Sequence, residues 1–337
     1  VMEGVLEWNK AFEKAGFKNA LAVKQQQAAD DFNNMDARHA SIRWFSGADV
    51  GFAIGPSQAD PRTGEILDAD IGMSDGFTRS ARRILVDDLA RPRGHDGEMC
   101  EDAETAAQEL HYALDLLEAR GLELDGPEAD ALAKAYLKRT IMHEVGHTIG
   151  LRHNFRASTV NDLKKIHDAE FTKVNGIASS VMDYSPFNIA PKGEKQGEYV
   201  MSTLGAYDYW AIEFGYYQES DSSIDASRRN NILARSTEPA LCFGNDADDM
   251  RAPGKAIDPR VMIGDMSSDA IGYARERIGL IKTLQSNLLA EYGKENRSYN
   301  ELRSNYLVLS SEWAVQAGVV SRYIGGVYVD RSFSNQN

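Results

Sequence analysis

Three histidines and a glutamate at fixed spacing are the residues of this sequence best suited to carry chemistry. The stretch from His143 to His153 contains three of the seven histidines of the chain, together with Glu144. His143 and His147 are four residues apart, so on a helix they project from the same face, one turn apart. Neutral imidazoles at this spacing can bind a zinc ion, and Glu144 would lie beside that metal.

A glycine and the third histidine extend this pattern to a site with three metal ligands. Glycine readily adopts the left-handed backbone of a sharp turn, so Gly150 can end the helix and let His153 return toward the metal. Three protein ligands leave one coordination position of zinc open for water, as in catalytic sites. Glu144 could then take a proton from that water. The alternative is a chance helical motif whose histidines only cap the helix or face solvent.

The long form of the motif, with its glycine and third histidine, resembles that of the metzincin metallopeptidases. Downstream of it, Ser180-Val181-Met182-Asp183-Tyr184 is similar to the methionine turn of these enzymes. The resemblance implies that Met182 forms an apolar floor beneath the imidazoles. It also implies that the phenol of Tyr184 stabilises the oxyanion, as in astacin-like and serralysin-like members. The alternative is that Met182 fills the core and Tyr184 is a half-buried aromatic residue.

The resemblance predicts a zinc-dependent endopeptidase that hydrolyses peptide bonds with metal-activated water. His143, His147 and His153 would bind one catalytic Zn²⁺, Glu144 would act as general base and then as general acid, and Tyr184 would assist. A rival hypothesis is a catalytically silent peptide-binding or scaffolding protein that retains a structural metal. The intact Glu144 favours the enzyme, because a structural zinc site does not need this carboxylate and usually fills its fourth position with protein.

The elements that must position these residues indicate an α/β (α+β) fold. Apolar residues at helical spacing predict helices over 2–16, 101–120, 127 into the zinc motif, 207–217, about 267–288, and 299–319. Extended segments are predicted at 41–45, 50–55 and 66–73. The resemblance implies a two-part peptidase with a twisted mixed sheet. Its upper part would cover 1–153 with the active-site helix, its lower part 154–240 with the methionine turn, and a mainly helical C-terminal extension 241–337.

The resemblance also predicts where a protein or peptide substrate binds. In metzincins the strand before the active-site helix lies at the edge of the sheet, above the cleft. Its unpaired N–H and C=O groups can pair with an extended peptide. Residues 66–73 are the best candidate for this strand, and the alternative is an ordinary strand inside the sheet.

Composition narrows the classes of partner. The chain has 337 residues, a formal net charge of −14 and a pI of about 5.0. An acidic surface repels phosphate groups, so nucleic acids and anionic membranes are not expected as partners. No apolar run approaches the roughly 20 residues that a membrane-spanning helix needs.

Three further features give weaker expectations. Cys100 and Cys242 could form a disulfide. The oxygen-rich stretch 244–249 could bind calcium, but it lacks the usual loop pattern, and the favoured alternative is a solvated acidic loop. The sequence resembles large bacterial zinc-dependent metzincin-type proteins, which include secreted and envelope proteins. This resemblance implies that the protein is extracellular or lies in the bacterial envelope or periplasm. The chain opens inside an amphipathic pattern at Val1, which suggests processing and an upstream pro-region.

Overall fold

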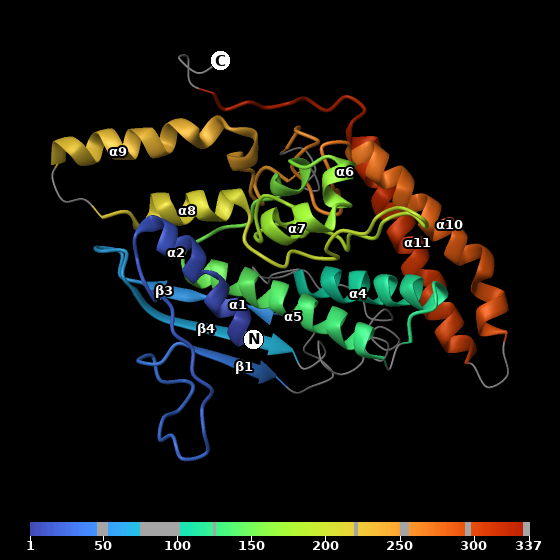
Figure 1. Cartoon of the computed structure of the whole chain (residues 1–337), viewed down its shortest axis with the longest axis horizontal. Coiled ribbons are helices and arrows are strands. Elements are labelled where there is room, and N and C mark those ends of the chain that lie inside the picture. Colours follow the sequence, from blue (N-terminus) through green and yellow to red (C-terminus); the bar gives the residue numbers. More distant parts are fainter. Residues whose placement is uncertain are drawn as a thin grey trace.

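The structure is a computed structural model, and it describes residues 1–45, 53–74, 102–123, 126–218, 222–249, 256–293 and 298–332. A small mixed sheet lies on one side of the long helices (Figure 1). The predicted combination of helices with a mixed sheet is confirmed. The predicted division into parts at 153 and 240 stays a prediction.

Strand β4 (Ile66–Ser74) is the central strand of this sheet. It pairs in parallel with β1 (Ser41–Phe45) on one side, and antiparallel with β2 (Ala53–Ile54) and β3 (Ser57–Ala59) on the other. The prediction that 66–73 is an edge strand open to substrate is therefore wrong. Strand β1 pairs with Asp70–Ser74 on one side, and β2 and β3 pair with the other side, so β4 is the central strand of the sheet.

The N-terminal helix predicted over 2–16 forms as two short helices, α1 (Met2–Glu7) and α2 (Asn9–Ala15). Trp8 joins them, and its buried indole N–H donates to the carbonyl of Met142 at 2.9 Å. Gly16 ends α2 with φ of +105°, a conformation that glycine adopts without strain. The two helices are thereby fixed to the long helix that carries the zinc motif.

That long helix is α5 (Pro127–Thr148), and α4 (Asp102–Ala119) precedes it. Proline at its first position and acidic residues in its first turn favour its start. The main core packs α5 between β4 and the N-terminal helices, and it includes Val5, Phe12, Ile71, Met73, Ile141 and Val145. The motif is thus built on a helix that is packed on two sides.

Beyond the motif the chain has few long elements until its last third. Three short helices follow the motif: η2 (Ala157–Thr159), α6 (Leu163–Ile166) and α7 (Ala169–Asn175). None of the three was predicted. They are followed by α8 (Ala206–Tyr216), α9 (Ser222–Ala234), η3 (Arg235–Thr237) and η4 (Pro239–Leu241). Helix α9 was not predicted.

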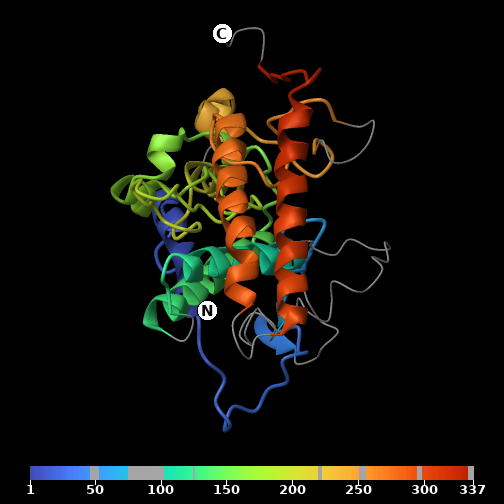
Figure 2. The same ribbon diagram turned by 90° about the vertical axis from the view of Figure 1, so that its right-hand side faces the viewer.

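Helices α10 (Ala270–Tyr292) and α11 (Tyr299–Arg322) form a pair that lies side by side at one end of the molecule (Figure 2). Their apolar faces share a second core with α4 and α5, which includes Leu110, Leu116, Tyr136, Leu280, Ile281, Leu284, Val308 and Leu309. In the described part of the chain, no helix is both long and apolar enough to cross a bilayer.

Candidate metal centre

The three predicted histidines converge on one point. One nitrogen from each ring of His143, His147 and His153 lies within 4.8 Å of the others. The Nε2 atoms of His143 and His147 are 3.0 Å apart. His153 reaches them because Gly150 takes φ of +97° directly after α5. The turn expected at Gly150 therefore brings the third ring to the first two.

Backbone carbonyls set the tautomer of the two helical histidines. Nδ1 of His143 lies 2.8 Å from the carbonyl oxygen of Val181, and Nδ1 of His147 lies 3.0 Å from that of Leu151. A carbonyl can only accept, so each Nδ1 carries the hydrogen and each Nε2 presents a lone pair. Burial, followed by the charges of nearby residues, lowers the pKa of His143 well below its usual value. Two facing lone pairs on neutral rings suit a bound cation.

His153 has a different environment from the other two. Its Nδ1 lies 2.8 Å from Oδ1 of Asp246, and its Nε2 lies 2.8 Å from the phenol oxygen of Tyr184. The ring stacks on Phe155 with centroids 5.0 Å apart. Tyr184 is thus next to the nitrogen that completes the cluster, and its predicted role at the oxyanion stays a prediction.

Glu144 is fully buried on α5, beside the first histidine. The backbone of Gly55, just after β2, passes directly over it. A Cβ atom at Gly55 would lie 2.6 Å from the carbonyl oxygen of Glu144 and 3.1 Å from its Oε2. Glycine is therefore required there for the chain to approach so closely. Sequence reasoning missed Gly55, whose only signal was its place at the end of a short extended segment.

Met182 packs against the helix between the histidines. It is fully buried, and a Cβ atom at Gly146 would overlap with its sulfur. The backbone N–H of Asn154 donates to the Met182 carbonyl at 3.0 Å, so the turn is joined to the residue after His153. Met182 therefore packs against α5 at Gly146, between His143 and His147 in sequence, and its role as an apolar floor beneath the imidazoles stays a prediction.

The methionine turn is held by Asp208, which sequence reasoning missed. Its carboxylate accepts from the Ser180 hydroxyl at 2.6 Å, from Val181 N–H at 3.0 Å and from Gly205 N–H at 2.8 Å. Burial raises the pKa of Asp208 to about 6, although these hydrogen bonds oppose the shift. Asp208 also lies in the first turn of α8, with Gly205 as N-cap. The only sequence signal was this capping pattern.

The peptide between Met182 and Tyr184 is fixed as well. Arg139, one turn before His143 on α5, donates to the carbonyl of Asp183 at 2.8 Å. The Asp183 carboxylate accepts from the backbone N–H of Ser158 at 2.8 Å, and burial raises its pKa to about 7. Arg139 therefore joins α5 to the turn, and Asp183 joins the turn to η2.

The stretch 244–249 has partners other than an ion. Asp246 faces His153, and Asp248 accepts from Arg331 and from the backbone N–H of Asn245. Among the described residues, the cluster that could hold a metal ion consists of His143, His147 and His153. Calcium binding stays a prediction. So does the disulfide: Cys242 has a free thiol and Cys100 lies outside the described residues.

Comparison with known families agrees with this geometry. The family model described as Met-zincin matches residues 125–337. The chain belongs to the Met-zincin family. The matched range takes in the whole of α5, the methionine turn and the C-terminal helices. The histidine cluster of this Met-zincin fits the zinc motif of its family, so the resemblance to metzincins is confirmed. No curated protein and no solved structure gave a match.

Proposed function

We propose that this Met-zincin is a zinc-dependent endopeptidase that acts at the cluster of His143, His147 and His153. One observation carries the proposal: three ring nitrogens lie within 4.8 Å of one another, and the phenol oxygen of Tyr184 lies 2.8 Å from one of them. Glu144 directly follows His143 on the same helix. Membership of the Met-zincin family supports the same activity.

The three histidines fit zinc better than a hard cation. Neutral imidazole nitrogens suit zinc, whereas calcium and magnesium take oxygen ligands. When bound, zinc acts as a Lewis acid that polarises a carbonyl and lowers the pKa of water to about 7. Three ligands leave it the open position that catalysis needs.

Glu144 and Tyr184 supply the proton transfer and the oxyanion contact in this proposal. Glu144 accepts a proton from the attacking water and passes it to the leaving amine. Tyr184 donates its O–H to the oxygen that becomes negative as the carbonyl is attacked. Arg139 and Asp208 hold the turn on which Tyr184 lies, so the phenol stays near the reacting carbonyl.

An extended peptide would bind along β2 and β3 instead of β4. Within the described residues, β2 and β3 pair with β4 alone, so their outer edge can take one more strand. The chain between them passes over Glu144 at Gly55. A peptide paired with this edge would run past the general base.

Substitution of Glu144 by Gln tests the mechanism. Gln cannot take the proton, so cleavage of a mixed peptide library should fall by about 10²–10⁴-fold while the zinc content stays that of the wild type. The matched control is Glu128→Gln, at an exposed position in the first turn of the same helix, which should cleave normally. Undiminished cleavage by the Glu144→Gln protein would rule out this role.

A further inference from the structure

We propose that Asp246 is a positioning residue, which orients His153 toward the metal and strengthens its hold on zinc. This inference rests on the proposed function of the histidine cluster. The nitrogen Nδ1 of His153 lies 2.8 Å from Oδ1 of Asp246. The other two histidines have backbone carbonyls at this position. At Nδ1, His153 therefore faces a charged side chain from a distant part of the chain, whereas His143 and His147 face backbone carbonyls.

A carboxylate in this position has two effects on a metal ligand. It fixes the orientation of the ring, since the Nδ1 hydrogen must point at the oxygen, and this directs the Nε2 lone pair to the opposite side of the ring. It also makes Nε2 a better electron donor, because the negative charge favours positive charge on the ring. His153 needs such help more than the others, since it follows a turn at Gly150 and does not belong to a helix.

The segment that carries Asp246 is fixed to the residues next to His153. The side chain of Asn154 donates to the carbonyl of Cys242 at 3.1 Å and accepts from the backbone N–H of Gly244 at 3.1 Å. The backbone N–H of Phe155 donates to the carbonyl of Gly244 at 2.8 Å. The histidine and its carboxylate therefore belong to one hydrogen-bonded unit, although 93 positions separate them.

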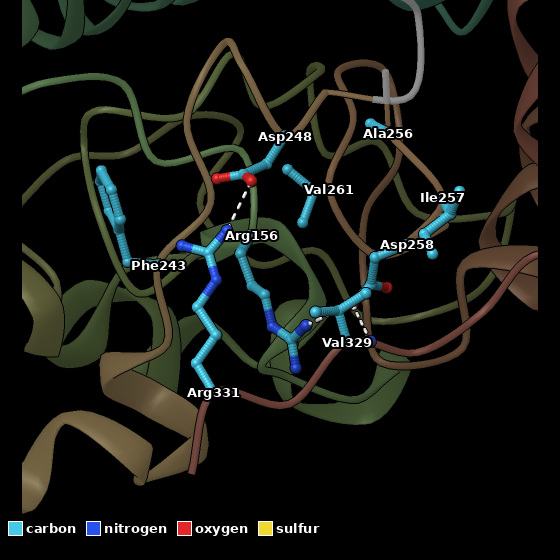
Figure 3. Close-up of a pocket in the computed structure, with 9 residues that line it drawn as sticks. All are labelled: Arg156, Phe243, Asp248, Ala256, Ile257, Asp258, Val261, Val329 and Arg331. Carbon is cyan, nitrogen blue, oxygen red and sulfur yellow. Dashed lines mark hydrogen bonds and ion pairs between the residues drawn. The ribbon is translucent and has the colours of Figure 1, made fainter. Parts of the chain in front are cut away.

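The C-terminal segment holds the same loop from its other side. Arg331 forms an ion pair with Asp248, two residues beyond Asp246, across a cavity of about 130 Å³ (Figure 3). The backbone N–H of Val329 donates to Asp258 at 2.9 Å, and Asp258 also accepts from Arg156 at 3.0 Å. The pair between Arg331 and Asp248 limits the positions that the loop can take, and the contacts of Asp258 fix the C-terminal segment near Arg331. Together they help an exposed aspartate to keep its place against the ring.

Zinc affinity, measured by competition with a chromophoric chelator, tests this role without use of peptidase activity. Asp246→Ala should weaken zinc binding by about 10–100-fold. The loss of zinc affinity should be smaller for Asp246→Asn, because its amide oxygen can still accept a hydrogen bond from Nδ1 of His153. The matched control, Asp31→Ala in the exposed segment before β1, should bind like the wild type. Thermal melts of the metal-free proteins check that each variant is folded.

A second comparison asks whether Asp246 acts through His153. In a chain that already carries His153→Ala, the further change Asp246→Ala should leave zinc affinity unchanged. If Asp246→Ala reduced zinc affinity equally in the wild-type chain and in the His153→Ala chain, the inference would be overturned. Wild-type zinc affinity in the single variant Asp246→Ala would overturn it too. A wild-type chain that binds no zinc would overturn the proposed function as well, which separates the two failures.

Discussion

At the scale of single residues, spacing predicted which side chains meet but not how each ring is oriented. The positions of His143, His147 and His153 follow from the helical period and the turn at Gly150. Their orientation depends on acceptors that no motif marks. Two of these acceptors are backbone carbonyls, which any residue could supply. The third is Asp246, which lies in the oxygen-rich stretch 244–249 and is 93 positions away from His153.

Tyr184→Phe tests the proposed oxyanion contact. The change removes only the phenol O–H, so kcat should fall by about 10²-fold with KM nearly unchanged. Zinc content should stay normal, because Tyr184 is not needed as a ligand. Steady-state kinetics on one peptide substrate measure the effect. The control is Tyr299→Phe, at an exposed position on α11. An unchanged kcat in Tyr184→Phe would limit this tyrosine to packing.

At the scale of elements, the methionine turn depends on α8 for its shape. Asp208 receives hydrogen bonds from Ser180, Val181 and Gly205, so one carboxylate ties the start of the helix to the turn. Replacement by Asn leaves an NH₂ group facing one of these donors. Loss of a buried hydrogen bond in this way costs about 1–3 kcal/mol of unfolding free energy.

The same residue gives a prediction for pH. Burial raises the pKa of Asp208 to about 6 in the folded chain, above the value of about 4 expected when the chain is unfolded. The folded state therefore holds this proton more tightly, and the stabilisation is complete below about pH 4 and is lost as pH rises through about 6. The stability advantage of the wild type over Asp208→Asn should thus shrink between these values. Chemical denaturation in the presence of a chelator measures it.

An advantage that grows with pH over that range would contradict the raised pKa. The chelator matters, because protonation of the histidines at low pH would otherwise remove zinc and change stability for a separate reason. Asp208 lies on α8, and it is not one of the clustered histidines, so its own titration can be followed in the metal-free chain.

The elements that could be predicted are those with a strong local signal. Helices α5, α10 and α11 are long and periodic, and they lie where spacing placed them. The role of β4 could not be predicted, because strand order depends on pairing between segments far apart in the chain. Helix α9 has a polar sequence with a weak apolar stripe, so its pattern resembled a loop.

At the scale of the whole molecule, the C-terminal helices contribute more than a packing surface. Arg277 on α10 pairs with Glu109 on α4 and Glu312 on α11. It also donates to the carbonyl of Phe187 at 3.0 Å, and Glu109 accepts from the Phe187 N–H at 2.8 Å. The chain just after Tyr184 is therefore held by α4 and α10, and Glu312 on α11 fixes Arg277 in turn. These charged residues could not be singled out from the sequence, because their importance depends on their burial in the folded chain.

The predicted cellular location and the upstream pro-region stay predictions. The location depends on resemblance to other proteins, and the pro-region depends on the amphipathic pattern at Val1. The family match covers the motif, the turn and the helical end together. The proposed site therefore draws on residues from α5 through to the segment after α11.

Removal and return of the metal, followed by peptide cleavage, tests the central claim most directly. The purified chain should contain about one zinc ion, as a site with three histidine ligands holds. Dialysis against a chelator should abolish cleavage of a mixed peptide library, and added zinc should restore it. A metal-free chain that still cleaves peptides at the original rate would contradict the account.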